Sequence, residues 1–196
     1  MPSLDPKLVL ASASPRRAEL LERAGYVFDI IPAAVDESRR QMESVCDYVR
    51  RLALEKSEAV ASNHRDRVVI GADTVVSIDR VMLGKPQDIA DAIRMLKLLA
   101  GRTHEVTTGL ALRLGETYLA ATEVTSVSFT GISDDLIGWY ASTGEPIDKA
   151  GAYGVQGIAS RFVTRIEGSY TNVVGLPIEL VERLLRKLVT SPIQNF

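Results

Sequence analysis

Short apolar runs and helical spacings of apolar residues divide the chain into alternating elements. The runs at residues 7–11 and 68–70 predict strands, because compact apolar runs bounded by turn residues are typical of buried strands. Between them, apolar residues recur at helical spacing over residues 44–62, which predicts a long amphipathic helix. The same patterns predict further strands at residues 27–31, 75–78, 81–83, 105–113, 118–129 and 162–166, and helices at residues 15–24, 89–100, 134–142 and 177–189.

The order of these elements indicates an α/β fold. Helices alternate with strands, but the segments at residues 105–113 and 118–129 are joined by a short turn and predict an antiparallel pair. We therefore expect a mixed twisted sheet with flanking helices rather than a wholly parallel sheet. The length of 196 residues suits one domain, so residues 1–196 are interpreted as a single domain with two lobes around a cleft.

Composition and charge exclude several classes of protein. Apolar residues make up 46% of the chain and charged residues 24%, as in ordinary globular proteins. The 23 basic and 25 acidic residues leave a net charge of −2, which argues against a general nucleic-acid or membrane-surface binder. A single cysteine, Cys46, excludes an intramolecular disulfide and a cysteine-based zinc site and fits a reducing cytoplasm. No segment has the length of a transmembrane helix, and the apolar stretch before Ser12 is too short for a secretion signal.

The sequence SASPRR, which follows the first strand, has the composition of an anion site. Ser14 and Pro15 are favoured at the N-cap and at the first position of a helix. Arg16 and Arg17 then fall in the first helical turn, where the helix dipole disfavours cations unless an anion is also present. Free backbone N–H groups, the Ser12 and Ser14 hydroxyls and the guanidinium groups would together form a phosphate cradle. A solvated basic helix start is the alternative interpretation.

Asp73 follows an apolar strand, in the sequence GADT. A carboxylate at such a position is costly unless something pairs with it. Ligands bind at the carboxyl ends of strands in open α/β sheets, and we interpret Asp73 as lying at such an end. If the first strand is its neighbour, Asp73 faces the phosphates near Arg16, where it would hold a divalent cation, orient water, or both. A structural Asp that caps the next turn is the alternative.

Other charged side chains could bind phosphate or metal. Lys85 stands before Pro86, which stiffens the turn and suits a phosphate contact, although exposed turn lysines are common. Asp36 and Glu37 lie in a loop, and metal ligation is expected of one of them, with a solvated acidic loop as the alternative. Lys56 on the long helix either points into a cleft or lays its methylenes on apolar surface.

The segment EPIDKAGAYGVQG at residues 145–157 has no helical or strand periodicity, which in a compact domain often indicates function. Gln156 can both donate and accept hydrogen bonds, as recognition of a base requires. Tyr153 would pack beside a base or fill the core of the loop, and Asn172 is interpreted as a turn or cap residue. The chain contains no GxxxxGK[ST] phosphate loop, no GxSxG nucleophile elbow and no GxGxxG.

Taken together, these segments resemble the Maf family of nucleoside triphosphate pyrophosphatases. The resemblance covers most of the chain in the family's order and is carried by four segments: ASASPRRAELLERAG at 11–25, VIGADTVV at 69–76, LGKPQDIADAIRMLKLLAGRTHEVTTG at 83–109, and EPIDKAGAYGVQGIASRFVTRIEGSYTNVVGLPI at 145–178.

The resemblance implies a two-lobed fold like that of inosine triphosphate pyrophosphatases and hydrolysis of a nucleoside triphosphate to the monophosphate and pyrophosphate with a divalent cation. The family's catalytic aspartate falls on Asp73. Its substrate-determining positions fall on Arg16, Thr74 and Gln156, and its other phosphate and metal-site residues fall on Glu37, Lys56 and Lys85. The KAGAYGVQG segment looks like the branch that acts on dTTP and UTP. A homodimer is a further expectation from the family.

From the residues and the resemblance together, we expect Mg²⁺ or Mn²⁺ to be held by Asp73 and Glu37, with Asp73 acting as general base or orienting water. Arg16, Lys56 and Lys85 would neutralise the phosphates, with Arg16 rather than Arg17 in direct contact. Two alternatives remain open. One is specificity for 7-methyl-GTP, and the other is a non-catalytic nucleotide-binding regulator of septum formation.

Overall fold

The protein is seen in a computed structural model that describes residues 7–190 and contains a seven-stranded sheet. Its strand order is β2-β1-β3-β5-β6-β7, and β4 pairs with β3 outside this path. The strands are β1 (Leu8–Leu10), β2 (Phe28–Ile30), β3 (Val68–Ile78), β4 (Val81–Leu83), β5 (Thr103–Leu114), β6 (Thr117–Phe129) and β7 (Val163–Glu167). The helices are α1 (Pro15–Arg23), α2 (Val45–Ala61), α3 (Ile89–Leu99), α4 (Asp134–Ser142), α5 (Tyr170–Val174) and α6 (Ile178–Thr190), with short 3₁₀ turns η1 (Ala150–Ala152) and η2 (Ile158–Phe162).

The sheet is mixed, as expected. β1 pairs in parallel with β2 and with β3, so α1 and α2 are the connections that bring the chain back to the same end of the sheet. β4 pairs antiparallel with β3, and β7 antiparallel with β6. Two helix caps predicted from the sequence are also confirmed, because Asp88 accepts from the Asp91 N–H and Ser133 from the Leu136 N–H.

The predicted position of Asp73 at a strand end is wrong. β3 does not stop at the apolar run but continues through the GADT sequence to Ile78. Only the parallel pairing ends early: the last β1 partner of β3 is Ile70, which also accepts the Ala11 N–H at 2.8 Å. Asp73 therefore lies inside a continuous strand, three residues beyond the parallel ladder. A carboxylate is tolerated there because a lysine pairs with it, as described below.

The described residues form two compact units. The first contains residues 7–73, 108–123 and 175–190, and the second contains residues 74–107 and 124–174. The two-lobed prediction is thus confirmed, and β3, β5 and β6 each run from one unit into the other.

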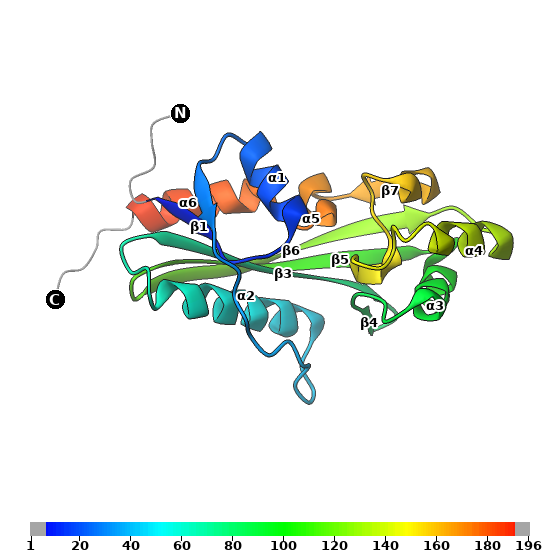
Figure 1. The fold of residues 1–196 in the computed structure, drawn as a ribbon, viewed down its shortest axis with the longest axis horizontal. Coiled ribbons are helices and arrows are strands. Elements are labelled where there is room, and N and C mark those ends of the chain that lie inside the picture. The colour runs from blue at the N-terminus through cyan, green and yellow to red at the C-terminus, as the bar shows by residue number, and fades with distance from the viewer. Residues whose placement is uncertain (1–6, 191–196) are drawn as a thin grey trace. The chain divides into compact units, whose positions relative to one another are not determined.

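In the first unit, helices cover both faces of the sheet. Figure 1 shows α2 on one face of its strands and α1 and α6 on the other. Two strand glycines bring α2 close to the sheet: a Cβ on Gly71 would lie 2.1 Å from the Ala53 carbonyl oxygen, and one on Gly109 would lie 2.1 Å from the Val49 carbonyl oxygen. Any side chain at these positions would push α2 away from the sheet. The two glycines therefore set the distance between α2 and the sheet, and with it the position of the polar side chains of α2.

In the second unit, the core is aromatic. Phe129 contacts His104, Tyr153 and Phe162 with its ring edge or face, and Tyr140 contacts Phe162. α3 packs against α4 and against η1.

The short helix α5, also in the second unit, was not predicted, and Asn172 within it is neither a turn nor a cap residue. Its side chain is fully buried, and its amide donates to the Val106 carbonyl and the Thr125 hydroxyl, both at 3.0 Å. Within residues 7–190, none of the helices has the combined length and apolar character that crossing a bilayer requires.

Candidate functional site

The turn between β1 and α1 is organised by Arg17. The Arg17 guanidinium donates to the carbonyls of Gly175 at 2.9 Å and Ala72 at 2.8 Å and to the Ser12 hydroxyl at 3.1 Å. The side chain is buried, and this burial lowers its pKa, although the nearby Asp73 charge acts in the opposite direction. Arg17 therefore fastens the start of α1 to β3 and to the segment before α6.

Ser14 occupies the N-cap of α1 as predicted, but its side chain makes no capping hydrogen bond. Its backbone N–H donates instead to the Ser12 hydroxyl at 3.2 Å. Ser12 is buried and thus accepts from both Ser14 and Arg17, while Arg16 is half-buried in the first turn of α1. The serines and arginines of SASPRR are therefore together at one helix start, with Ser12 linking the turn internally.

Lys56, Glu37 and Asp73 meet in a cluster of one cation and two carboxylates. Lys56 projects from α2, and its Nζ lies 2.7 Å from Asp73 Oδ1 and 2.6 Å from Glu37 Oε1. The Lys56 and Asp73 side chains are only 9% and 12% exposed, whereas Glu37 is 60% exposed. One of the two interpretations of Lys56 was that its methylenes lie on apolar surface. That interpretation is excluded, because the ammonium group itself is buried between the carboxylates.

Burial raises the pKa of Asp73, and the positive charges of Lys56 and Arg17 oppose that shift. The net direction is upward, so this carboxylate is a better proton acceptor than a solvated aspartate. Perturbation of a buried acid by desolvation and specific charges is a recognised mark of functional sites. The cluster can thus hold a cation, accept a proton from water, or do both.

The carboxylates suit a divalent cation of the magnesium type. Asp73 and Glu37 converge on a single positive charge, at Lys56 Nζ. Mg²⁺ is commonly bound through one or two carboxylates, with phosphate and water oxygens as the other ligands. Among residues 7–190 no group of three or more His, Cys, Asp or Glu residues could form a dedicated metal cage. The two carboxylates therefore fit a cation whose other ligands are water or phosphate oxygens.

The loop before α2 supplies Glu37 and not Asp36. Both carboxylate oxygens of Asp36 are engaged at 2.9 Å by the N–H and the hydroxyl of Ser38. These hydrogen bonds lower the pKa of Asp36, which is fully exposed. The residue types alone do not distinguish these two adjacent acids, and the resemblance points to Glu37. In the structure a local turn around Ser38 engages Asp36, while Glu37 contacts Lys56.

Thr74, Lys85 and Gln156 belong to the second unit. Thr74 is half-buried in β3, directly after Asp73, while Lys85 and Gln156 are exposed in loops. Tyr153 fills the core of its loop: it is buried, and its hydroxyl lies 2.9 Å from His104 Nε2.

Glu145 holds the loop at residues 145–157, a role that the sequence did not reveal. Its carboxylate accepts from the Tyr140 hydroxyl at 2.9 Å and from the Ile158 N–H at 2.9 Å. A Cβ on Gly157 would lie 2.6 Å from the same carboxylate. A larger residue next to Gln156 would therefore displace the Glu145 carboxylate from its present position.

Two α2 residues were also overlooked, Tyr48 and Arg51, which bind the loop that carries Glu37. The available sequence signal was the spacing on α2: Arg51 lies four residues, about one helical turn, before Glu55, which directly precedes Lys56.

Comparison with known proteins relates this chain to one family. A sequence model described as Maf-like protein matches residues 7–188. A dTTP/UTP pyrophosphatase of Koribacter versatilis is 53% identical over 180 residues, covering 92% of this chain and 93% of the relative. A dTTP/UTP pyrophosphatase of Bacillus mycoides is 49% identical over 182 residues, covering 93% and 94%. The structure of the Staphylococcus aureus Ham1 protein matches with a TM-score of 0.51 at 15% identity, covering 93% of this chain and 99% of that one, a likeness of fold alone. The chain belongs to the Maf-like protein family.

Proposed function

We propose that this protein is a nucleoside triphosphate pyrophosphatase that hydrolyses dTTP and UTP to the monophosphate and pyrophosphate. The observation that carries the proposal is the cluster of Lys56, Glu37 and Asp73 in a chain about half identical to two dTTP/UTP pyrophosphatases. A buried carboxylate of raised pKa, a second carboxylate and a lysine are the groups that metal-dependent hydrolysis of a phosphate anhydride requires.

Asp73 would act as the general base. Water adds to the α-phosphorus, the anhydride bond to the β-phosphate breaks, pyrophosphate departs, and the water proton passes to an Asp73 carboxylate oxygen. Burial suits Asp73 to this step because it raises the pKa of the carboxyl group. Lys56 orients Asp73 through their 2.7 Å contact and supplies positive charge beside the phosphates.

Asp73 and Glu37 would hold the divalent cation, Mg²⁺ or Mn²⁺. When bound, the cation neutralises phosphate charge and lowers the pKa of water. Lys56 Nζ, 2.6 Å from Glu37 Oε1, supplies positive charge to both carboxylates at the same place. Asp73 and Glu37 would thus hold the cation while Lys56 keeps a positive charge beside both carboxylates.

Substrate recognition would begin at the SASPRR turn. Arg16 stands in the first turn of α1, where backbone N–H groups attract phosphate. The roles of Thr74 and Gln156 in recognising the pyrimidine, and of Lys85 in phosphate binding, stay predictions from the sequence and the resemblance. A cytoplasmic location stays a prediction from the composition, and a homodimer one from the resemblance.

Side-by-side turnover tests this function and its two rivals. The protein is incubated with Mg²⁺ and dTTP, UTP or 7-methyl-GTP, and the products are separated by ion-exchange chromatography. Release of pyrophosphate and monophosphate from dTTP and UTP, with little from 7-methyl-GTP, is expected. Faster turnover of 7-methyl-GTP would overturn the specificity. Tight binding of nucleotide without any product would favour a non-catalytic regulator.

A further inference from the structure

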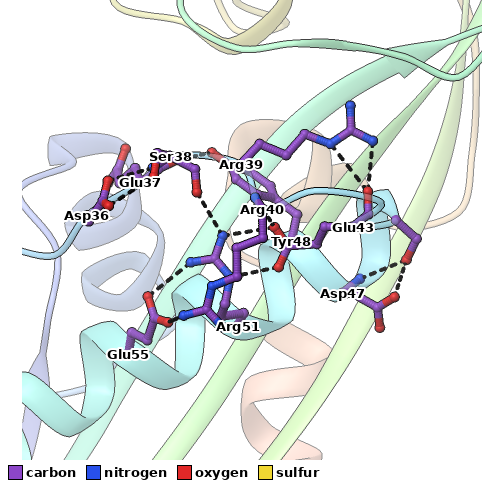
Figure 2. Close-up of polar contacts among 11 residues, drawn as sticks. Asp36, Glu37, Ser38, Arg39, Arg40, Glu43, Asp47, Tyr48, Arg51 and Glu55 are labelled. Atoms are coloured by element: carbon purple, nitrogen blue, oxygen red, sulfur yellow. Dashed lines mark hydrogen bonds and ion pairs between the residues drawn. The ribbon is translucent and has the colours of Figure 1, made fainter.

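The loop that carries Glu37 is bound to α2 through its backbone. The Tyr48 hydroxyl donates to the Glu37 carbonyl at 2.9 Å, and an Arg51 Nη donates to the Ser38 carbonyl at 3.0 Å. Figure 2 shows both side chains reaching from α2 to this part of the loop. Two consecutive carbonyls, at Glu37 and the residue after it, are thus fixed by two side chains of one helix.

Arg51 is itself held rigidly. Its guanidinium makes a two-pronged contact with Glu43, at 2.6 and 2.9 Å, and a third contact with Glu55 at 3.1 Å. Its side chain is 12% exposed and that of Glu43 only 8%, which is unlike a mobile surface ion pair. Hydrogen bonding from Arg51 lowers the pKa of Glu43 to about 2, so the pair stays charged at any working pH.

Further contacts close the loop around this arginine. The Arg39 guanidinium donates to the Glu43 carbonyl at 2.7 and 3.2 Å, and the Arg40 N–H donates to a Glu43 carboxylate oxygen at 3.1 Å. The Arg51 guanidinium carbon lies 5.5 Å from the centroid of the Tyr48 ring. The two helix residues therefore form one connected support, which Figure 2 displays together with the loop.

The same helix binds both the backbone and the side chain of Glu37. Lys56, five residues after Arg51 on α2, contacts the Glu37 carboxylate at 2.6 Å. A glutamate that is 60% exposed has many rotamers open to it, so fixing its backbone restricts where the carboxylate can reach.

We propose that Arg51 and Tyr48 are positioning residues that hold Glu37 where it binds the divalent cation beside Asp73. This inference rests on the proposed function, since it assigns the cation to these carboxylates. Residues that hydrogen-bond to metal ligands, without binding the metal themselves, contribute roughly 10–100-fold to metal affinity in other proteins. The support acts before any nucleotide binds, so its loss is measurable with the metal alone.

The experiment measures Mn²⁺ binding by the nucleotide-free protein, followed by electron paramagnetic resonance of free Mn²⁺. Arg51→Met is expected to weaken Mn²⁺ binding roughly tenfold, and Tyr48→Phe, which removes one hydroxyl, by a smaller factor. Arg51→Lys keeps the positive charge but loses the two-pronged guanidinium contact. Its Mn²⁺ affinity should lie between those of wild type and Arg51→Met.

Arg113→Met is the matched control. Arg113 of β5 is 13% exposed and pairs at 2.6 Å with Glu58 of α2. Its partner is thus a residue of α2 and not of the loop at residues 36–38. Its replacement should change Mn²⁺ affinity less than twofold. Arg51 and Arg113 variants that unfold at similar temperatures would separate the positioning effect from general loss of stability.

A combination with Glu37→Gln separates the outcomes. In that background Arg51→Met should weaken Mn²⁺ binding no further, because the ligand that it positions is already lost. If Arg51→Met is equally damaging with and without Glu37, or harmless in both, the positioning inference is overturned. If Glu37→Gln alone leaves Mn²⁺ binding unchanged, the fault lies with the proposed metal site instead.

Discussion

Acidification should destabilise this protein through His104, a histidine buried in the second unit. The side chain is 2% exposed and is flanked by the rings of Phe129 and Tyr153. Its Nε2 atom lies 2.9 Å from the Tyr153 hydroxyl, and its Nδ1 atom has no hydrogen-bond partner within the described residues. A protonated ring would carry a second donor with nothing to accept it. Burial accordingly lowers the pKa of His104 to about 4.

The magnitude follows from the difference between folded and unfolded pKa values. The ordinary value is 6.5 and the folded value is about 4, so the unfolded chain binds the proton more tightly over that interval. Above about pH 7 His104 is neutral in both states and costs no stability. As the pH falls from 6.5 toward 4, the free energy of unfolding decreases, by about 3 kcal/mol in total. At about pH 5 the loss should be about 2 kcal/mol.

Urea unfolding of wild type and His104→Gln, at about pH 7.5 and about pH 5, measures this contribution. Glutamine can still reach Tyr153 but does not titrate. The wild type should lose about 2 kcal/mol more than the variant between the two pH values, whatever the variant's stability at neutral pH. Equal losses in both proteins would refute the assignment, because carboxylate effects are common to the two.

Three further substitutions test the packing and the charges. Lys56→Met should cost about 3 kcal/mol in urea unfolding, because it leaves Asp73 buried without its nearest cation, and the same change should cost much less beside Asp73→Asn. Gly71→Ala should cost about 2 kcal/mol or more in the same assay, since the added methyl would lie 2.1 Å from a carbonyl oxygen of α2. Glu145→Gln should raise the KM for dTTP more than it lowers kcat, because it loosens the loop at residues 145–157, and a purely stability-related change would leave KM intact.

Much of the fold could be predicted because local pattern and tertiary packing agree. The helical spacing over residues 44–62 and the apolar run of β1 are strong local signals, and both elements formed as expected. The start of β3 at residue 68 was predicted, but its end was missed because the GADT sequence imitates a strand end. What overrides that signal is tertiary: Lys56 neutralises Asp73, and Gly71 allows α2 to lie close enough to deliver it.

The site was predictable as a set of residue types but not as a set of contacts. The SASPRR turn and Asp73 were singled out from the sequence, yet the burial of Arg17 against the Gly175 carbonyl depends on chain 158 residues away. No local pattern distinguishes Glu37 from Asp36, since the choice depends on a hydrogen-bonded turn at Ser38. Arg51 was not singled out from the sequence, because its partner Glu43 lies outside the helix and no local pattern links the two.

The central claim is that Asp73 carries the hydrolysis of the nucleoside triphosphate, and Asp73→Asn tests it most directly. The assay is pyrophosphate release from dTTP under saturating Mg²⁺, with nucleotide binding measured separately and Asp66→Asn, an exposed aspartate of the first unit, as control. Loss of the general base should lower kcat by a factor of about 10²–10⁴ while dTTP still binds, and the control should match wild type. Wild-type turnover by Asp73→Asn would contradict the account.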